Sequence, residues 1–234
     1  MRVLALLFLL ACPAAAEQFA ARYDLSIRGI TGGQITLGAR EDGEAYVISG
    51  QAGATGIVGR MVKYGYGGRA EGRLAGEAFR PRSYTEVELD DGERITTVTR
   101  FRSNRPVSVS FEPPREPKPW DIEPTAQSGV VDPLTAMYAV MRPVAPDAAC
   151  AQSHDIFDGR HVSRMSLGAP QAREGGGVVC AGEYRRLRGY DPDDMNETPV
   201  VPLTFYYGSL ADGRLQVDEI RSPTRFGDAV LRRR

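Results

Sequence analysis

Several chemically informative residues and motifs are scarce or missing in this chain of 234 residues. It contains 2 histidines, so few side chains can act as a base near neutral pH. It has no Cys-x-x-Cys, no Gly-x-Ser-x-Gly and no phosphate-cradling glycine motif, which argues against thioredoxin-like redox chemistry, serine hydrolase chemistry and phosphate binding. Its 29 basic and 30 acidic residues nearly balance, so no basic field favours nucleic acid as a partner.

The first residues have the pattern of a secretory signal peptide. Arg2 precedes an unbroken apolar run from Leu4 to Ala11, and Ala14 to Ala16 supply the small residues that a signal peptidase accepts. We therefore expect cleavage of residues 1–16 after Ala16, which leaves a periplasmic protein with no transmembrane span in the mature chain. The alternative is that Leu9 to Cys12 form a lipobox, so that a lipidated Cys12 anchors the protein to a membrane.

Cleavage after Ala16 changes the cysteine count. It removes Cys12 and leaves Cys150 and Cys180. Two cysteines in an oxidising compartment most simply form one disulfide, so we predict a Cys150–Cys180 bond. The alternative is a pair of free buried thiols.

Asp-Gly dipeptides, which favour tight hairpin turns, recur between strand-like segments. They are Asp42-Gly43, Asp91-Gly92, Asp158-Gly159 and Asp212-Gly213. Two-residue turns centred on these dipeptides predict the strand registers. In chain order, they pair Leu37 with Ile48, Glu88 with Ile95, Ile156 with His161, and Leu210 with Leu215. The pattern predicts a mostly β protein, an antiparallel meander of hairpins that forms a curved sheet, half-barrel or sandwich with one or two short helices packed on it.

A helix is expected at residues 132–142. Asp132 suits the N-cap and Pro133 the first helical position. The apolar residues at helical spacing are Leu134, Met137, Tyr138 and Met141. Such a stripe either covers a ligand cavity or packs into the core. The glycine-rich segment 50–68, which includes Ile57 and Met61, is a second candidate for a cavity wall or lid.

Residues 17–234 are expected to form a single β-rich domain. A proline-rich connection at residues 112–127 marks either a subdomain crossover or a passage from one sheet edge to another. This connection contains Trp120, the only tryptophan, which either pins the loop onto the core or anchors a partner.

Both histidines, His154 and His161, lie in one expected hairpin beside Asp155 and Asp158. They are the only histidine candidates for a catalytic base, and the alternative is that both are surface residues of a sheet. Their diagonal spacing in the hairpin is too wide for shared coordination of zinc. We therefore expect no metal and no cofactor.

The order of landmarks along the chain resembles domain-of-unknown-function family 3108, a family of exported Gram-negative proteins. The most specific landmarks are Val131-Asp132-Pro133-Leu134 and Phe157-Asp158-Gly159-Arg160. The others are Tyr23 through Gly29, Asp42-Gly43 with Tyr46, Pro81 with Tyr84, Cys150, Tyr184 and Gly189-Tyr190. The resemblance implies no activity and no catalytic residues, and only fold-level analogy suggests periplasmic lipoprotein carriers as a functional comparison.

The function that these observations favour is that of a non-enzymatic periplasmic binding protein. Its partner would be an apolar ligand such as a lipid, an acyl chain or a lipoprotein. The candidate cavity residues are Leu134, Met137, Tyr138, Met141, Ile57 and Met61. Two alternatives remain: a cell-envelope scaffold protein that contacts another protein around Trp120, and a hydrolase-type enzyme that uses the region of His154 and His161.

Overall fold

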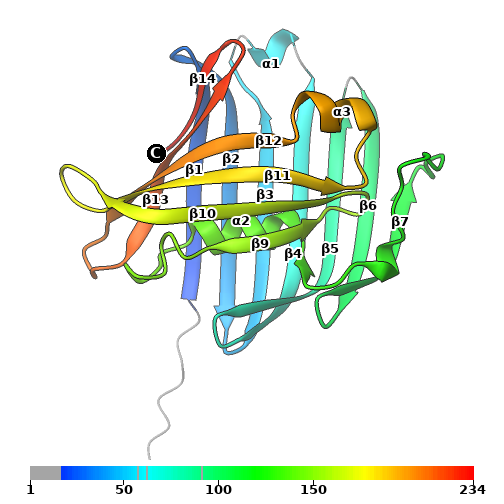
Figure 1. Ribbon diagram of the computed structural model, residues 1–234, viewed down its shortest axis with the longest axis horizontal. Coiled ribbons are helices and arrows are strands. Elements are labelled where there is room, and N and C mark those ends of the chain that lie inside the picture. Colours follow the sequence, from blue (N-terminus) through cyan, green and yellow to red (C-terminus); the bar gives the residue numbers. More distant parts are fainter. Residues whose placement is uncertain (1–16, 57, 62, 91) are drawn as a thin grey trace, which may run out of the picture.

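The computed structural model describes residues 17–56, 58–61, 63–90 and 92–234 (Figure 1). The expected signal peptide, with Cys12, and Ile57 lie outside these described residues. The strands of the first half are β1 (Glu17–Ile27), β2 (Ile30–Asp42), β3 (Ala45–Ala54), β4 (Tyr64–Ala75), β5 (Ala78–Asp90), β6 (Glu93–Arg102) and β7 (Arg105–Glu112). Those of the second half are β8 (Val130–Val131), β9 (Ser153–Phe157), β10 (Val162–Ala172), β11 (Val178–Arg188), β12 (Val200–Ser209), β13 (Leu215–Thr224) and β14 (Gly227–Arg233).

These strands form one 14-stranded sheet, which confirms the mostly β fold class. The sheet runs in the order β7 to β1, then β14 to β8, so the pairing of β1 with β14 joins the two halves. β8 and β9 are parallel, whereas the other neighbouring strands are antiparallel. Figure 1 shows the strands of the two halves crossing, with helix α2 (Pro133–Met141) between them. We call the side of the sheet that faces α2 the inner face.

The two edge strands, β7 and β8, come close enough for the sheet to be nearly closed. Asn104, in the turn before β7, donates from Nδ2 to the carbonyl oxygens of Phe79 (2.9 Å) and Val130 (3.3 Å). The backbone N–H of Val130 in turn donates to the carbonyl of Asn104 (3.1 Å). The proline-rich connection at residues 112–127 therefore runs between the two edges of one sheet.

The structure confirms one of the four predicted hairpin registers and corrects the others. Ile156 pairs with Ser163 rather than with His161, and Leu215 pairs with Ser209 rather than with Leu210. Glu88 pairs with Ile95, as predicted. Ile48, however, pairs with Ala39 rather than with Leu37. The turn is shifted because Gly43, with a φ of 59°, takes the first of its two central positions, where glycine tolerates the left-handed backbone. The slip is two residues, so Leu37 and Ile48 still share the buried face.

The helix expected at residues 132–142 is α2, and it begins and ends as predicted. The Asp132 carboxylate caps it by accepting from the Thr135 N–H (2.9 Å) and the Thr135 hydroxyl (2.6 Å). The expectation of one apolar stripe was too narrow, because the two halves of the sheet enclose the helix and bury nearly all of its side chains. Two further short helices are α1 (Val58–Met61) and α3 (Pro192–Glu197).

The predicted disulfide is present between Cys150 and Cys180, whose Cα atoms lie 5.6 Å apart. It ties the segment that follows α2 to strand β11, so it fixes the helix connection against the second half of the sheet. None of the described helices combines the length and the apolar character needed to cross a membrane.

Candidate functional site

Helix α2 packs tightly against the first half of the sheet. The Leu134 side chain lies over Gly50 and Gly68, which face each other on β3 and β4. A Cβ atom added at Gly50 would lie 2.5 Å from Leu134 Cδ2, and one added at Gly68 would lie 2.9 Å from Leu134 Cδ1. Only glycine leaves room for Leu134 at these two positions, so the pair forms a notch that holds the helix.

Tyrosine hydroxyl groups also hold α2 in place on the side that carries Leu134. Tyr46 hydrogen-bonds to Thr135 (3.1 Å), and the Tyr138 hydroxyl donates to Glu41 (2.8 Å). The Tyr138 ring also packs edge-on against Phe19 and Phe79. This face of α2 is therefore a filled core.

The opposite face of α2 borders a cavity of about 310 Å³. The cavity lies between the helix and the inner face of the second half of the sheet. Its lining is almost entirely apolar and comprises Pro133, Met137, Val140, Met141, Ile156, Asp158, Met165, Tyr184, Leu203, Phe205, Ile220 and Leu231. Its size is at the lower end of the range for small-molecule sites, which is roughly 300–1,000 Å³.

The structure separates the cavity candidates named from the sequence. Met137 and Met141 line the cavity, whereas Leu134 and Tyr138 point into the filled core on the other side of α2. Met61 belongs to α1, but its side chain, like all of Ile57, lies outside the described part of the chain. The spacing of apolar residues revealed that 132–142 is a helix but could not show which side of it faces the cavity.

Sequence reasoning missed the cavity residues contributed by strands, such as Met165, Phe205 and Leu231. Each sits at an inward-facing position of its strand, and alternation along the strand gives that face. The alternation does not distinguish a residue that fills the core from one that borders empty space. That distinction depends on how far α2 stands from the second half of the sheet.

A larger depression of about 660 Å³ lies on the outer face of β1 to β4. It is more open to solvent and more polar, with Ser49, Gln51 and Arg22 among its lining residues. Apolar ligands gain most from enclosed apolar walls, so the cavity beside α2 is the better candidate for a binding site.

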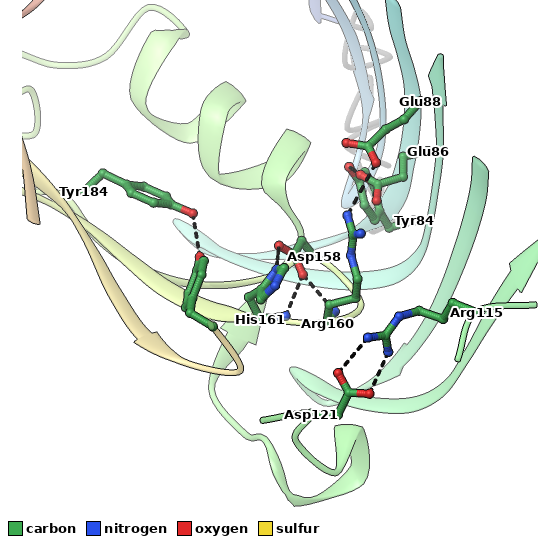
Figure 2. Close-up of polar contacts among 10 residues, drawn as sticks. Tyr84, Glu86, Glu88, Arg115, Asp121, Asp158, Arg160, His161 and Tyr184 are labelled. Atoms are coloured by element: carbon green, nitrogen blue, oxygen red, sulfur yellow. Dashed lines mark hydrogen bonds and ion pairs between the residues drawn. The ribbon is translucent and has the colours of Figure 1, made fainter. Parts of the chain in front are cut away.

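The polar end of the cavity is the turn between β9 and β10 (Figure 2). Asp158 accepts from the backbone N–H groups of Arg160 (2.8 Å) and His161 (2.7 Å), and its Oδ2 lies 2.8 Å from Nδ1 of His161. Burial acts to raise the pKa of Asp158, but the hydrogen bonds from His161 and Arg160 outweigh it and hold the pKa below its usual value. Asp158 is therefore an ionised, fully engaged carboxylate that shapes the turn.

The same turn docks on the first half of the sheet. Arg160 reaches Glu88 on β5 (3.4 Å), as Figure 2 shows. A Cβ atom at Gly159 would lie 2.8 Å from Thr97 Cγ2 on β6, so the backbone of the turn lies directly against that strand. The Phe157-Asp158-Gly159-Arg160 landmark is thus a contact between the two halves of the sheet.

The two histidines have different surroundings. The His161 ring stacks on Tyr190 with centroids 4.3 Å apart, and the Tyr190 hydroxyl hydrogen-bonds to that of Tyr184 (3.0 Å). His154 bonds to Gln152 (2.9 Å), and burial lowers its pKa. Within the described residues, no group of three or more His, Cys, Asp or Glu side chains is arranged to hold a metal ion.

Glu86, a buried carboxylate, faces inward from β5. It accepts a hydrogen bond from the Tyr84 hydroxyl (2.5 Å), which in turn bonds to the Tyr66 hydroxyl (2.7 Å). Burial raises the pKa of Glu86 to about 7, although the Tyr84 hydrogen bond and the charge of Arg160 act in the opposite direction. No sequence pattern indicates this burial, because a Glu two residues from another Glu is typical of a solvated strand face.

Glu86 should make the stability of the protein depend on pH. Its pKa rises from 4.5 in the unfolded chain to about 7 in the folded one, so the folded state binds more protons between these values. The free energy of unfolding should therefore fall as the pH rises through this window, by up to about 3 kcal/mol. Urea unfolding at about pH 5 and about pH 8 measures this change.

Glu86→Gln should remove the part of the fall that Glu86 contributes, because a neutral amide can still accept from Tyr84. A smaller fall should remain from Asp132, because burial raises its pKa to about 6. The exposed Glu93→Gln is the matched control and should keep the wild-type profile. An unchanged profile in Glu86→Gln would show that Glu86 is not the titrating group.

Comparisons with known proteins give one match. Residues 22–174 match the model of a family described as "Protein of unknown function (DUF3108)". No curated protein and no solved structure matches this chain.

Proposed function

This chain belongs to the DUF3108 family of proteins of unknown function, and on that premise we propose that it is an exported, non-enzymatic protein that binds an apolar ligand in the cell envelope. The observation that carries the proposal is the cavity of about 310 Å³ beside α2. Binding of an apolar ligand would remove apolar surface from water, which stabilises the complex by roughly 25 cal/mol per Å² of apolar surface buried.

The chemistry of the walls favours a flexible apolar chain as the ligand. Met137, Met141 and Met165 all border the cavity. Methionine side chains are unbranched and adjust their shape, so they accommodate ligands of varied outline. An acyl chain or the acyl part of a lipid fits such a wall better than a rigid polar molecule.

The polar end of the cavity adds little direct recognition. Asp158 already accepts from the turn backbone and His161, and the Tyr184 hydroxyl is paired with Tyr190. A ligand therefore finds few free polar groups, and its affinity would come from apolar burial. The contact between Asp158 and His161 also supports a structural rather than a catalytic role for His161.

Export is part of the proposal, on two grounds. The pattern of residues 1–16 is that of a signal peptide. The Cys150–Cys180 disulfide suits an oxidising compartment such as the periplasm.

The scaffold alternative has less support, since Trp120 is half-buried beside the Arg115–Asp121 ion pair (2.8 Å).

Filling the cavity should abolish ligand binding. Met165→Trp places a larger side chain in the cavity, so we expect affinity for a fluorescent fatty-acid probe to fall by about ten-fold or more, the loss of about 1.4 kcal/mol or more of apolar contact. Val107→Trp, at an exposed position on β7, is the matched control and should bind as the wild type does. Fluorescence titration measures both affinities.

Native mass spectrometry of the gently purified protein provides an independent check. It should reveal a co-purifying apolar species in the wild type that is depleted in Met165→Trp. If no such species appears and the wild type also fails to bind the probe, the cavity does not carry an apolar ligand.

A further inference from the structure

Six large apolar side chains are exposed among the described residues, and three of them lie together at one end of the sheet. Among the described residues, Ile30 is 69% exposed and Phe226 57% exposed, and Ile27 is also exposed. They lie in the turn regions of the β1–β2 and β13–β14 hairpins. Figure 1 shows both hairpin tips at the upper edge of the molecule, together with α1. Side chains of this size are normally exposed singly, so a group of them indicates a contact surface.

The two hairpin tips form one surface. Ile27 pairs with Ile30 across the first hairpin and with Ala229 of β14 on its other side. A Cβ atom at Gly227 would lie 2.9 Å from Arg28 Cγ, so the second turn lies directly against the first. Helix α1 adjoins them, since Val58 Cγ2 would lie 2.8 Å from a Cβ atom at Gly32.

Basic residues accompany these apolar side chains. Arg28 and Arg225 occupy the two tips, and Arg225 lies over the Phe226 ring at 4.7 Å. Arg60 and Lys63 follow at α1, and the β3–β4 connection contains no acidic residue. Asp228 is the one carboxylate in residues 26–33 and 222–230, which form the two tips, while the acidic β5–β6 turn is separated from β1 by β2 to β4. We call Ile27, Ile30 and Phe226 with these four basic residues the tip surface.

We propose that the tip surface docks onto a membrane that contains anionic phospholipid. Aliphatic and aromatic side chains at the tips can enter the headgroup boundary, while long basic side chains beside them reach the phosphates. Each basic side chain near an anionic surface strengthens binding about five-fold. A partner protein with a neutral apolar surface would make no use of four cations around three apolar side chains.

Strand pairing links the tip surface to the cavity wall. Leu231, which lines the cavity, pairs with Leu25. Leu25 and Ile27 are two residues apart on β1, so they lie on the same face, and Ile27 faces Ile30 at the tip. A row of apolar residues thus runs from the cavity wall to the docking end. Docking itself does not depend on the cavity holding a ligand.

Vesicle co-sedimentation with the full chain tests the proposal. We expect the wild type to bind vesicles of phosphatidylcholine and phosphatidylglycerol more strongly than vesicles of phosphatidylcholine alone, and added salt to weaken this preference. Ile30→Asp/Phe226→Asp should weaken binding by about ten-fold or more, because each Asp removes an apolar contact and adds repulsion. Arg28→Asn/Arg225→Gln should weaken binding to the anionic vesicles by about five-fold for each arginine and leave binding to the neutral ones unchanged.

Val107→Asp is the matched control, since Val107 is an exposed aliphatic residue on β7 outside the tip surface. It should bind anionic vesicles as the wild type does, and circular dichroism should show that all variants fold. Failure of the wild type to bind anionic vesicles would overturn the proposal, as would an equal loss in Val107→Asp. A wild-type dimer that Phe226→Asp converts to a monomer would instead assign the surface to a second copy of this chain. Because binding needs no ligand in the cavity, an empty cavity with intact vesicle binding would overturn only the proposed function.

Discussion

Gly50→Ala is expected to lower the free energy of unfolding by about 1–3 kcal/mol, a large loss for a single methyl group. The added Cβ would lie 2.5 Å from Leu134 Cδ2, closer than carbon atoms can approach, so α2 or strand β3 must move. Neither moves freely, because Asp132, Thr135 and Tyr46 hold the helix at the same place. Urea unfolding followed by circular dichroism measures the change.

Gly67→Ala is the matched control for this prediction. Gly67 neighbours Gly68 on β4, and a Cβ atom there meets nothing within 4 Å. Its replacement should be neutral or stabilising by up to about 1 kcal/mol, because alanine has less freedom in the unfolded chain. Equal losses at Gly50 and Gly67 would show that strand propensity, not the Leu134 contact, sets the effect.

A double variant separates the steric clash from other causes. Leu134→Ala alone should cost about 2–5 kcal/mol, since it leaves a hole in the filled core. Gly50→Ala/Leu134→Ala should cost clearly less than the sum of the two, because the alanine at Leu134 no longer meets the new methyl group. Additive losses would show that Leu134 does not clash with a methyl group at position 50.

Loss of the disulfide is expected to lower the free energy of unfolding by about 3–4 kcal/mol. The bond closes a loop between cysteines 30 positions apart, and its main effect is to restrict the unfolded chain. Cys150→Ala/Cys180→Ala should show this loss in urea unfolding. Because Cys180 pairs with the cavity residue Phe205, we also expect weaker binding of the fatty-acid probe.

The wild type in reductant provides the control for the cysteine variant. Reduction should lower wild-type stability toward that of Cys150→Ala/Cys180→Ala and leave the variant itself unchanged. If the double variant is as stable as the oxidised wild type, the bond does not stabilise the fold.

The features that the sequence predicted correctly depend on local signals. Asp132 and Pro133 mark the start of a helix through groups within one turn, and α2 begins there. The pairing of Glu88 with Ile95 was also predicted from a local signal, the Asp-Gly dipeptide between the two strands. The disulfide followed from the count of cysteines rather than from geometry.

The features that the sequence could not predict depend on contacts between distant strands. Gly50 and Gly68 are an ordinary pair of strand glycines until Leu134 is placed over them. Glu86 is buried because the second half of the sheet covers β5, and no property of its neighbours in sequence indicates this. The cavity has the same origin, since its walls come from α2 and from β9 to β14 together.

The pairing of β1 with β14 also sets the order in which the protein can finish folding. Ser26 of β1 and Val230 of β14 are hydrogen-bonded although 204 positions apart, so β1 lacks its second neighbour until the far end of the chain is available. Pairings across such separations form slowly, and an unpaired strand edge recruits other chains. During that interval β1 is an open aggregation edge, and the sheet cannot close around α2. An unfolded chain therefore needs protection from aggregation until its last strand has paired with β1.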